Sequence, residues 1–103
     1  MILYNVTVNL EQSILADWLH WMKEVHIPEV METGFFIDNK IWKVLTNGDS
    51  GFTYSIQYTL NSMADYNIYI TSHAPELQKK HVDRYGDKVL AFRTLLDLEH
   101  HHG

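Results

Sequence analysis

The 103-residue sequence contains no cysteine. This absence excludes a disulfide framework, an iron–sulfur protein, a thiolate zinc site and a cysteine nucleophile. Basic residues are also few: eight Lys and Arg stand against thirteen Asp and Glu, for a formal net charge of −5. An acidic chain without a basic run argues against nucleic acid as a partner. No apolar run approaches the roughly 20 residues of a membrane-spanning helix, which argues against a membrane partner.

The two ends of the chain carry little that bears on the fold. Residues 1–7 lack a basic stretch and a small-residue cleavage site, so we predict a strand there and not a signal peptide. We therefore expect a cytoplasmic protein. Residues 98–103 read Leu-Glu-His-His-His-Gly, which resembles a cloning scar with a short purification tag. We predict one domain over 1–97 and a flexible tail over 98–103, either tag-derived or native.

The hydrophobic pattern predicts six main elements. Alternation, or a high content of aromatic and β-branched residues, predicts four strands: 2–10, 35–46, 52–60 and 88–96. Apolar residues spaced three and four apart predict two helical segments: 14–34 and 63–85. Turn-forming residues over 47–51 predict a hairpin between the middle strands. The order β-α-β-β-α-β without a linker predicts a ferredoxin-like α+β sandwich, in which a four-stranded antiparallel sheet carries both helices on one face.

Local signals refine the helical segments. Asn9 with Gln12, and Ser62 with Asp65, have the spacing of capping pairs at the two helix starts. The apolar stripe of the first helix is predicted to run through these residues: Ile14, Leu15, Trp18, Trp21, Met22 and Val25. The second stripe reaches the neighbourhood of His81 and Val82 and ends near Gly86.

A short motif occurs once in each helical segment: His26-Ile27-Pro28-Glu29-Val30 matches His73-Ala74-Pro75-Glu76-Leu77. Proline disfavours the α conformation in the residue before it, so we expect each motif to break or kink its helix. His26 and His73 are candidates for a general base or a proton donor. A purely structural role for the motif stays open. A shared metal site is not expected, because late positions on antiparallel helices lie at opposite ends.

One face of the predicted sheet is polar at its centre. The central strands place there the following residues: Asn5, Thr7, Asn9, Thr53, Ser55, Gln57 and Thr59. The outer strands add Trp42 or Lys43, and Phe92 or Arg93, depending on a register that the sequence does not fix. Because the outer strands carry apolar residues on both of their faces, we expect a second copy of the chain to cover this face.

Several segments together resemble a known family: 2–9, 18–28, Tyr58, 73–75 and 92–96. The family consists of short uncharacterised bacterial proteins, commonest in Bacteroidetes. The chain is more distantly similar to the dimeric α/β-barrel superfamily, with its cofactor-free quinol monooxygenases, EthD-like proteins, muconolactone isomerases and some haem-degrading enzymes. The stretch from Trp21 to Pro28 is similar to EthD-like members. The resemblance implies a homodimer whose sheets pair face to face, with a small-molecule pocket between sheet and helices.

Two functional hypotheses stay open. The first is a cofactor-independent enzyme of monooxygenase or isomerase type acting on a small aromatic or polyketide-like substrate, with His26 and His73 as catalytic residues. Its substrate contacts would be Trp18, Trp21, Asn5, Gln57 and Tyr58. Haem binding through His26 or His73 is suggested only by analogy with the superfamily. The second hypothesis is a non-catalytic dimeric binding protein, in which most of the aromatic residues serve the core.

Overall fold

The computed structural model describes residues 1–45 and 52–103, so the hairpin turn predicted at 47–51 lies outside the described residues. Its elements follow in chain order: β1 (Ile2–Leu10), η1 (Gln12–Ile14), α1 (Leu15–Trp21), η2 (Met22–His26), α2 (Ile27–Glu32), β2 (Phe36–Lys43), β3 (Phe52–Leu60), α3 (Met63–Ser72), α4 (Ala74–Tyr85), η3 (Gly86–Lys88) and β4 (Val89–Asp97). Within these ranges no helix is both long and apolar enough to cross a membrane.

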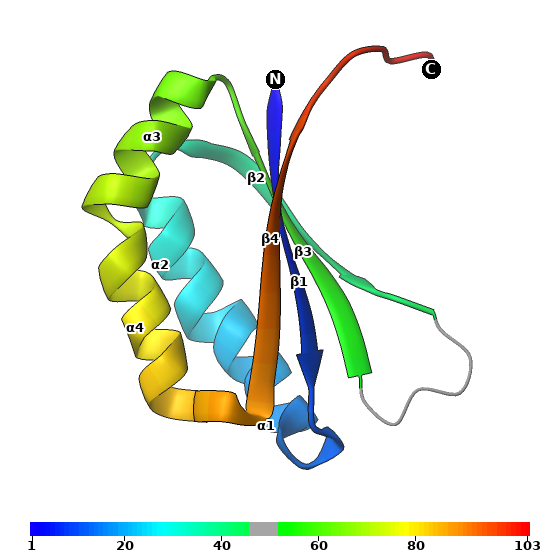
Figure 1. Ribbon diagram of the computed structural model, residues 1–103, viewed down its shortest axis with the longest axis vertical. Coiled ribbons are helices and arrows are strands. Elements are labelled where there is room, and N and C mark those ends of the chain that lie inside the picture. The colour runs from blue at the N-terminus through cyan, green and yellow to red at the C-terminus, as the bar shows by residue number, and fades with distance from the viewer. Residues whose placement is uncertain (46–51) are drawn as a thin grey trace.

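The four strands form one antiparallel sheet in the order β2-β3-β1-β4. The helices all lie against one of its faces, which gives two layers (Figure 1). This arrangement confirms the predicted ferredoxin-like α+β fold, with the first and third strands at the centre. β1 and β4 run side by side from Ile2 opposite Asp97, and the N–H of Leu98 donates to the carbonyl of Met1 at 3.0 Å.

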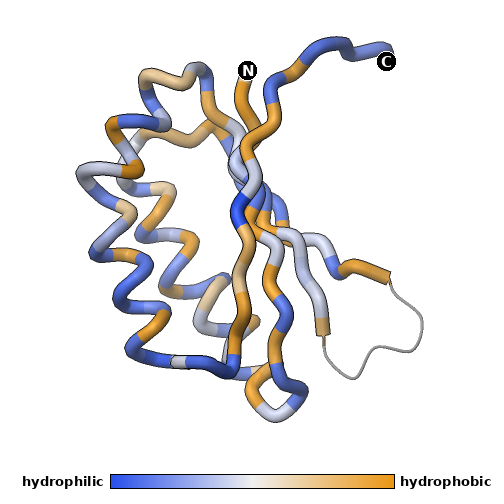
Figure 2. Tube along the Cα trace, viewed as in Figure 1, coloured by the Kyte–Doolittle hydropathy of each residue, from blue (hydrophilic) through white to orange (hydrophobic). Residues whose placement is uncertain are grey.

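The alternation along β1 and β3 separates the two faces of the sheet and is visible as alternating colours in Figure 2. Ile2, Tyr4, Val8 and Leu10 of β1 are buried beneath the helices. Trp18 of α1 is fully buried and, with Leu10 and Leu60, is among the largest side chains that the fold encloses completely. Burial of such apolar area is the main favourable term for this fold.

The other face of the sheet, opposite the helices, is called here the open face. Asn5, Thr7 and Asn9 lie on it, next to Gln57, Ser55 and Thr53 of β3. The register resolves the two alternatives left by the sequence: Trp42 pairs with Ser55, and Phe92 pairs with Thr7, so both aromatic side chains are on the open face. Their exposed fractions are 53% for Trp42 and 69% for Phe92.

Of the break or kink expected at Pro28, the structure shows no break: the helical segment continues through the proline, and a π-helical turn separates α1 from α2. Ile27 keeps an α conformation (φ −62°, ψ −44°), and its N–H donates to the carbonyl of Met22, five residues earlier. In a regular α-helix the proline ring clashes with the carbonyl four residues before it. The π-helical turn η2 inserts one extra residue before Pro28, and such single-turn insertions are frequently found at functional sites.

The π-helical turn also shifts the buried stripe by about one position. Val25, predicted to face the core, is 42% exposed. His26, Ile27 and Val30 are buried instead. A regular 3.6-residue repeat does not anticipate this change of phase.

The second motif does interrupt its helix, as predicted. His73 has a non-helical conformation (φ −123°, ψ −40°) and separates α3 from α4, with Pro75 in the first turn of α4. The predicted cap at Ser62 is confirmed, since its Oγ accepts a hydrogen bond from the N–H of Asp65 at 3.2 Å. The Asn9 cap is wrong: Glu11 precedes the first helical turn, and the Asn9 amide donates to Thr53 Oγ1 at 3.0 Å within the sheet.

A leucine pair tests how much the core stabilises the fold. Leu10→Ala removes a side chain that is 1% exposed. We expect it to lower the free energy of unfolding by about 2–5 kcal/mol in urea denaturation. Leu45→Ala is the matched control, because Leu45 is 88% exposed; its change should stay within about 0.5 kcal/mol. Equal effects of the two substitutions would contradict the assigned core.

Candidate functional site

A cavity of about 170 Å³ lies between the sheet and the helical layer. Most of its wall is apolar or aromatic and comes from β1, β3, β4, η2, α2, α3 and α4. The polar groups in the wall are few: the tyrosines Tyr4, Tyr58 and Tyr69, together with His26, Gln78, His81 and Arg93. Among the described residues that line it there is no Asp or Glu. A mainly apolar concavity with a few polar groups is the usual form of a small-molecule site.

His26 enters this wall at the end of the π-helical turn. It is 9% exposed, and its Nδ1 is buried without a hydrogen-bond partner among the described residues. Its ring stacks on Trp21, with centroids 4.7 Å apart and planes 21° from parallel. Burial, and secondly the nearby His81, lower the pKa of His26 from 6.5 to about 4. The imidazole is therefore neutral at pH 7.

His81 of α4 lies beside His26, with ring centroids 5.9 Å apart. The indole Nε1–H of Trp18 donates to His81 Nε2 at 3.0 Å. Burial, and secondly the charge of Arg93, lower the pKa of His81 to about 4. Because Nε2 of this neutral ring accepts a hydrogen bond, the proton resides on Nδ1. Trp18 thus fixes the tautomer of His81, a residue of the cavity wall, with the proton on Nδ1.

The sheet contributes the tyrosines and one cation. Arg93 Nε donates to Tyr4 Oη at 3.1 Å, across the pairing of β4 with β1. Burial raises the pKa of Tyr4, although Arg93 opposes this shift. Burial also raises the pKa values of Tyr58 and Tyr69 well above the ordinary value of 10. All three phenols therefore stay protonated and uncharged at neutral pH.

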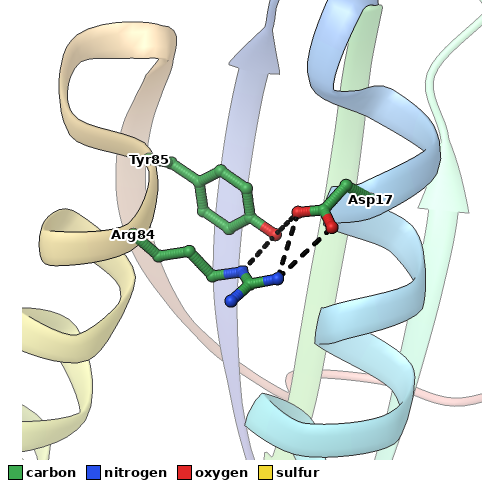
Figure 3. Close-up of polar contacts among 3 residues, drawn as sticks. All are labelled: Asp17, Arg84 and Tyr85. Carbon is green, nitrogen blue, oxygen red and sulfur yellow. Dashed lines mark hydrogen bonds and ion pairs between the residues drawn. The ribbon is translucent and has the colours of Figure 1, made fainter.

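A polar cluster on the outer side of the helices holds α1 against the end of α4 (Figure 3). Tyr85 Oη donates to Asp17 Oδ2 at 2.9 Å and accepts from Arg84 Nε at 3.1 Å. The Arg84 guanidinium lies 5.4 Å from the ring centre of Trp21, and the Tyr85 ring meets Trp21 edge-on at 5.6 Å. The cluster therefore supports Trp21, on which the His26 ring stacks.

The structure brings together only some of the residues predicted for a site. His26 and Tyr58 line the cavity. Trp18 and Trp21 lie behind the cavity wall, where they orient His81 and pack on His26. His73 lies outside the wall, at the break between α3 and α4, with its ring 5.6 Å from that of Phe35.

Asn5 and Gln57 lie on the open face, on the opposite side of the sheet from the cavity. They belong to a hydrogen-bonded row there: Ser55 Oγ donates to Asn5 Oδ1 at 2.6 Å and accepts from Gln57 Nε2 at 3.2 Å. Trp42 Nε1 donates to Gln57 Oε1 at 3.1 Å. These polar groups therefore satisfy one another and do not contribute to the cavity.

Five polar residues of the cavity wall were not predicted as site residues: Tyr4, Tyr69, Gln78, His81 and Arg93. A usable signal existed for His81, since it occupies a position of the apolar stripe four residues after Leu77. Arg93 depended on the strand register, which a sequence alone leaves open. Gln78 carries no such signal.

The sequence comparison identifies the family. Residues 1–99 match a family described as a domain of unknown function, DUF4286. The chain belongs to the DUF4286 family. No curated protein sequence matches this DUF4286 chain.

Solved structures resemble the DUF4286 chain over almost its whole length. A dimeric ferredoxin-like protein from an uncultured marine organism has a TM-score of 0.73 at 11% identity, covering 98% of this chain and 97% of its own. An EthD family protein from Bacillus halodurans C-125 has a TM-score of 0.65 at 9% identity, covering 91% of this chain and 97% of its own. A hydroxynitrile lyase from Passiflora edulis has a TM-score of 0.56 at 17% identity, covering 93% of this chain and 94% of its own. At such identities the likeness establishes the shared fold alone.

The buried histidines predict a pH-dependent stability. His26 and His81 have pKa values of about 4 when folded, against 6.5 for the ordinary group. The unfolded chain therefore binds more protons between these values. We expect the full stabilisation above pH 6.5 and its loss as the pH falls to about 4, on the order of 3 kcal/mol per histidine.

Urea unfolding between pH 4 and 7.5 measures this slope. His26→Gln should flatten it, whereas His73→Gln, outside the cavity wall, is the matched control and should keep the wild-type slope. An unchanged slope in His26→Gln would contradict the burial of a neutral His26.

Proposed function

We propose that the cavity binds a small aromatic or cyclic carbonyl compound and that His26 removes a proton from it, in a reaction of isomerase type. The observation that carries the proposal is the neutral, buried imidazole of His26, with an unpartnered Nδ1, in the wall of an otherwise mainly apolar cavity. Unsatisfied buried polar atoms are rare in native proteins and call for an explanation. Since Nδ1 is closed off, a role in ligand chemistry would use the other ring nitrogen, Nε2.

The size of the cavity narrows the ligand. A dry cavity of about 150 Å³ is known to hold benzene, and the space here is about 170 Å³. A molecule with one aromatic or alicyclic ring is therefore the best match, and a multi-ring polyketide is too large to be enclosed. The apolar walls favour burial of the ring, while the protonated Nδ1 of His81 is a donor for the carbonyl oxygen.

The proposed step balances without an oxidant. A C–H bond next to the carbonyl group breaks, its electron pair forms the enolate, and the proton passes to His26. His26 then returns a proton to carbon or to oxygen. His81 would donate a hydrogen bond to the oxygen on which negative charge develops, which is the usual way such intermediates are stabilised.

Haem does not fit this site. Clefts for drug-sized ligands measure about 300–1,000 Å³, and a porphyrin exceeds a typical drug in area. The cavity of about 170 Å³ is smaller than even these clefts. A cavity of this size favours chemistry that uses the chain's own acid and base groups. We also propose that the protein is cytoplasmic.

Proton exchange tests the proposed base directly. With 2-indanone in D₂O at neutral pH, the wild-type protein should accelerate loss of the α-proton signals in ¹H NMR. His26→Gln should reduce this acceleration by about 10²–10⁴-fold, the usual contribution of a general base, while circular dichroism stays unchanged. His73→Gln is the control and should exchange at the wild-type rate. Binding of 2-indanone without any exchange would leave a non-catalytic binding protein and refute the enzymatic part.

We also propose that two copies of the chain pair through their open faces. Both outer strands present apolar groups there: Trp42 on β2, and Leu90, Phe92 and Leu96 on β4. These apolar groups lie on the two edges of one face, on either side of the polar row, and large apolar side chains exposed in this way favour an interface on that face. The description of the marine structural neighbour as dimeric supports the same assembly here.

Light scattering at micromolar concentration tests the assembly. We expect a dimer for the wild type and a monomer for Phe92→Ser, since Phe92 is 69% exposed on the open face. Ile68→Ser is the matched control, because Ile68 is 48% exposed on α3, on the other layer. A monomeric wild-type protein would overturn the proposed pairing.

A further inference from the structure

The wall of the cavity holds one cation, Arg93, and no carboxylate among the residues that the structure describes. The ion pairs of the described chain join Lys79 to Asp83, Lys80 to Glu29 and Arg84 to Asp17, and do not include Arg93. Arg93 is exposed, so water solvates its guanidinium in the absence of a ligand. A positive charge in the wall of a cavity whose described lining has no acid still favours an anionic ligand.

The other titratable residues of the described cavity wall are uncharged at neutral pH. Tyr4, which accepts from Arg93 Nε at 3.1 Å, keeps its proton, and so do the buried Tyr58 and Tyr69. The two histidines are neutral as well. The described wall therefore carries one positive charge, which matches a ligand with one negative charge.

The hydrogen bond to Tyr4 also orients the guanidinium. Since Nε is occupied, the two terminal nitrogens remain as a pair of parallel donors. Such a pair matches the two oxygens of a carboxylate, and bidentate pairs of this kind are shorter and stronger than neutral hydrogen bonds. The β4 strand that carries Arg93 is at the edge of the sheet, and Arg93 is itself exposed, so the charged end of a ligand stays in contact with water.

We infer that the ligand of this cavity is a monocarboxylate: an acid with a single ring, whose ring occupies the apolar space and whose carboxylate pairs with Arg93. The inference rests on the proposed binding function and specifies its ligand class. It assigns Arg93 the role of a specificity-determining residue. His26 and His81 stay beside the ring, where the proposed proton transfer occurs.

Calorimetric titration with benzoate and its neutral isostere benzamide tests the inference at pH 7. The wild type should bind benzoate at least tenfold more tightly than benzamide. Arg93→Met should weaken benzoate binding by about 10–100-fold, the equivalent of a charge-assisted hydrogen-bonded pair, and leave benzamide unchanged. Lys79→Met is the matched control, since it removes the same charge from a residue that pairs with Asp83 on the surface, 73% exposed.

The outcomes separate the two proposals. If benzamide binds as tightly as benzoate, the carboxylate inference is overturned and the binding cavity stands. If benzoate, benzamide and 2-indanone all fail to bind the wild type, both proposals are overturned. The comparison of benzoate with benzamide uses the wild-type protein alone, so it decides the question even if Arg93→Met does not fold.

Discussion

The strict alternation of β1 and β3 is the constraint on which the rest of the structure depends. Because side chains on a strand point alternately to opposite faces, Tyr4 and Tyr58 go beneath the helices while Asn5 and Gln57 go to the open face. A shift of one residue in either strand would exchange these sets. Both the cavity and the polar row on the open face therefore depend on one pairing register. A residue of these strands that lines the cavity cannot also belong to the polar row.

Within that frame, a proline determines which residues of the helical layer reach the cavity. Pro28 is incompatible with a regular α-helix passing through it. The preceding turn is π-helical and contains one extra residue, which accommodates the proline. This change turns Val25 outward and leaves His26, Ile27 and Val30 buried. The matching motif at His73 has no such insertion, breaks the helix instead, and leaves its histidine outside the cavity. Two nearly identical sequence motifs thus have different structural outcomes.

The fold was predictable from the sequence because its signals are periodic and local. The strands, their order and the cap at Ser62 follow from alternation, element order and side-chain chemistry. The candidate site was only partly predictable. His26 carried a visible signal, but the contact between His26 and His81, and the placement of Arg93 beside Tyr4, join segments that are far apart in the chain. Such contacts depend on register and helix phase, which single-sequence patterns do not determine.

The neighbouring positions of the two chain ends have a consequence for connectivity. Ile2 pairs with Asp97 on adjacent strands, and both ends of the chain emerge at the same end of the sheet (Figure 1). A short linker between them would extend the existing β1–β4 ladder as a hairpin. The fold is therefore well suited to circular permutation, since termini that lie close together allow the chain to be closed and reopened elsewhere. In such a permutant the wall of the cavity would be made of the same side chains in a different order along the chain.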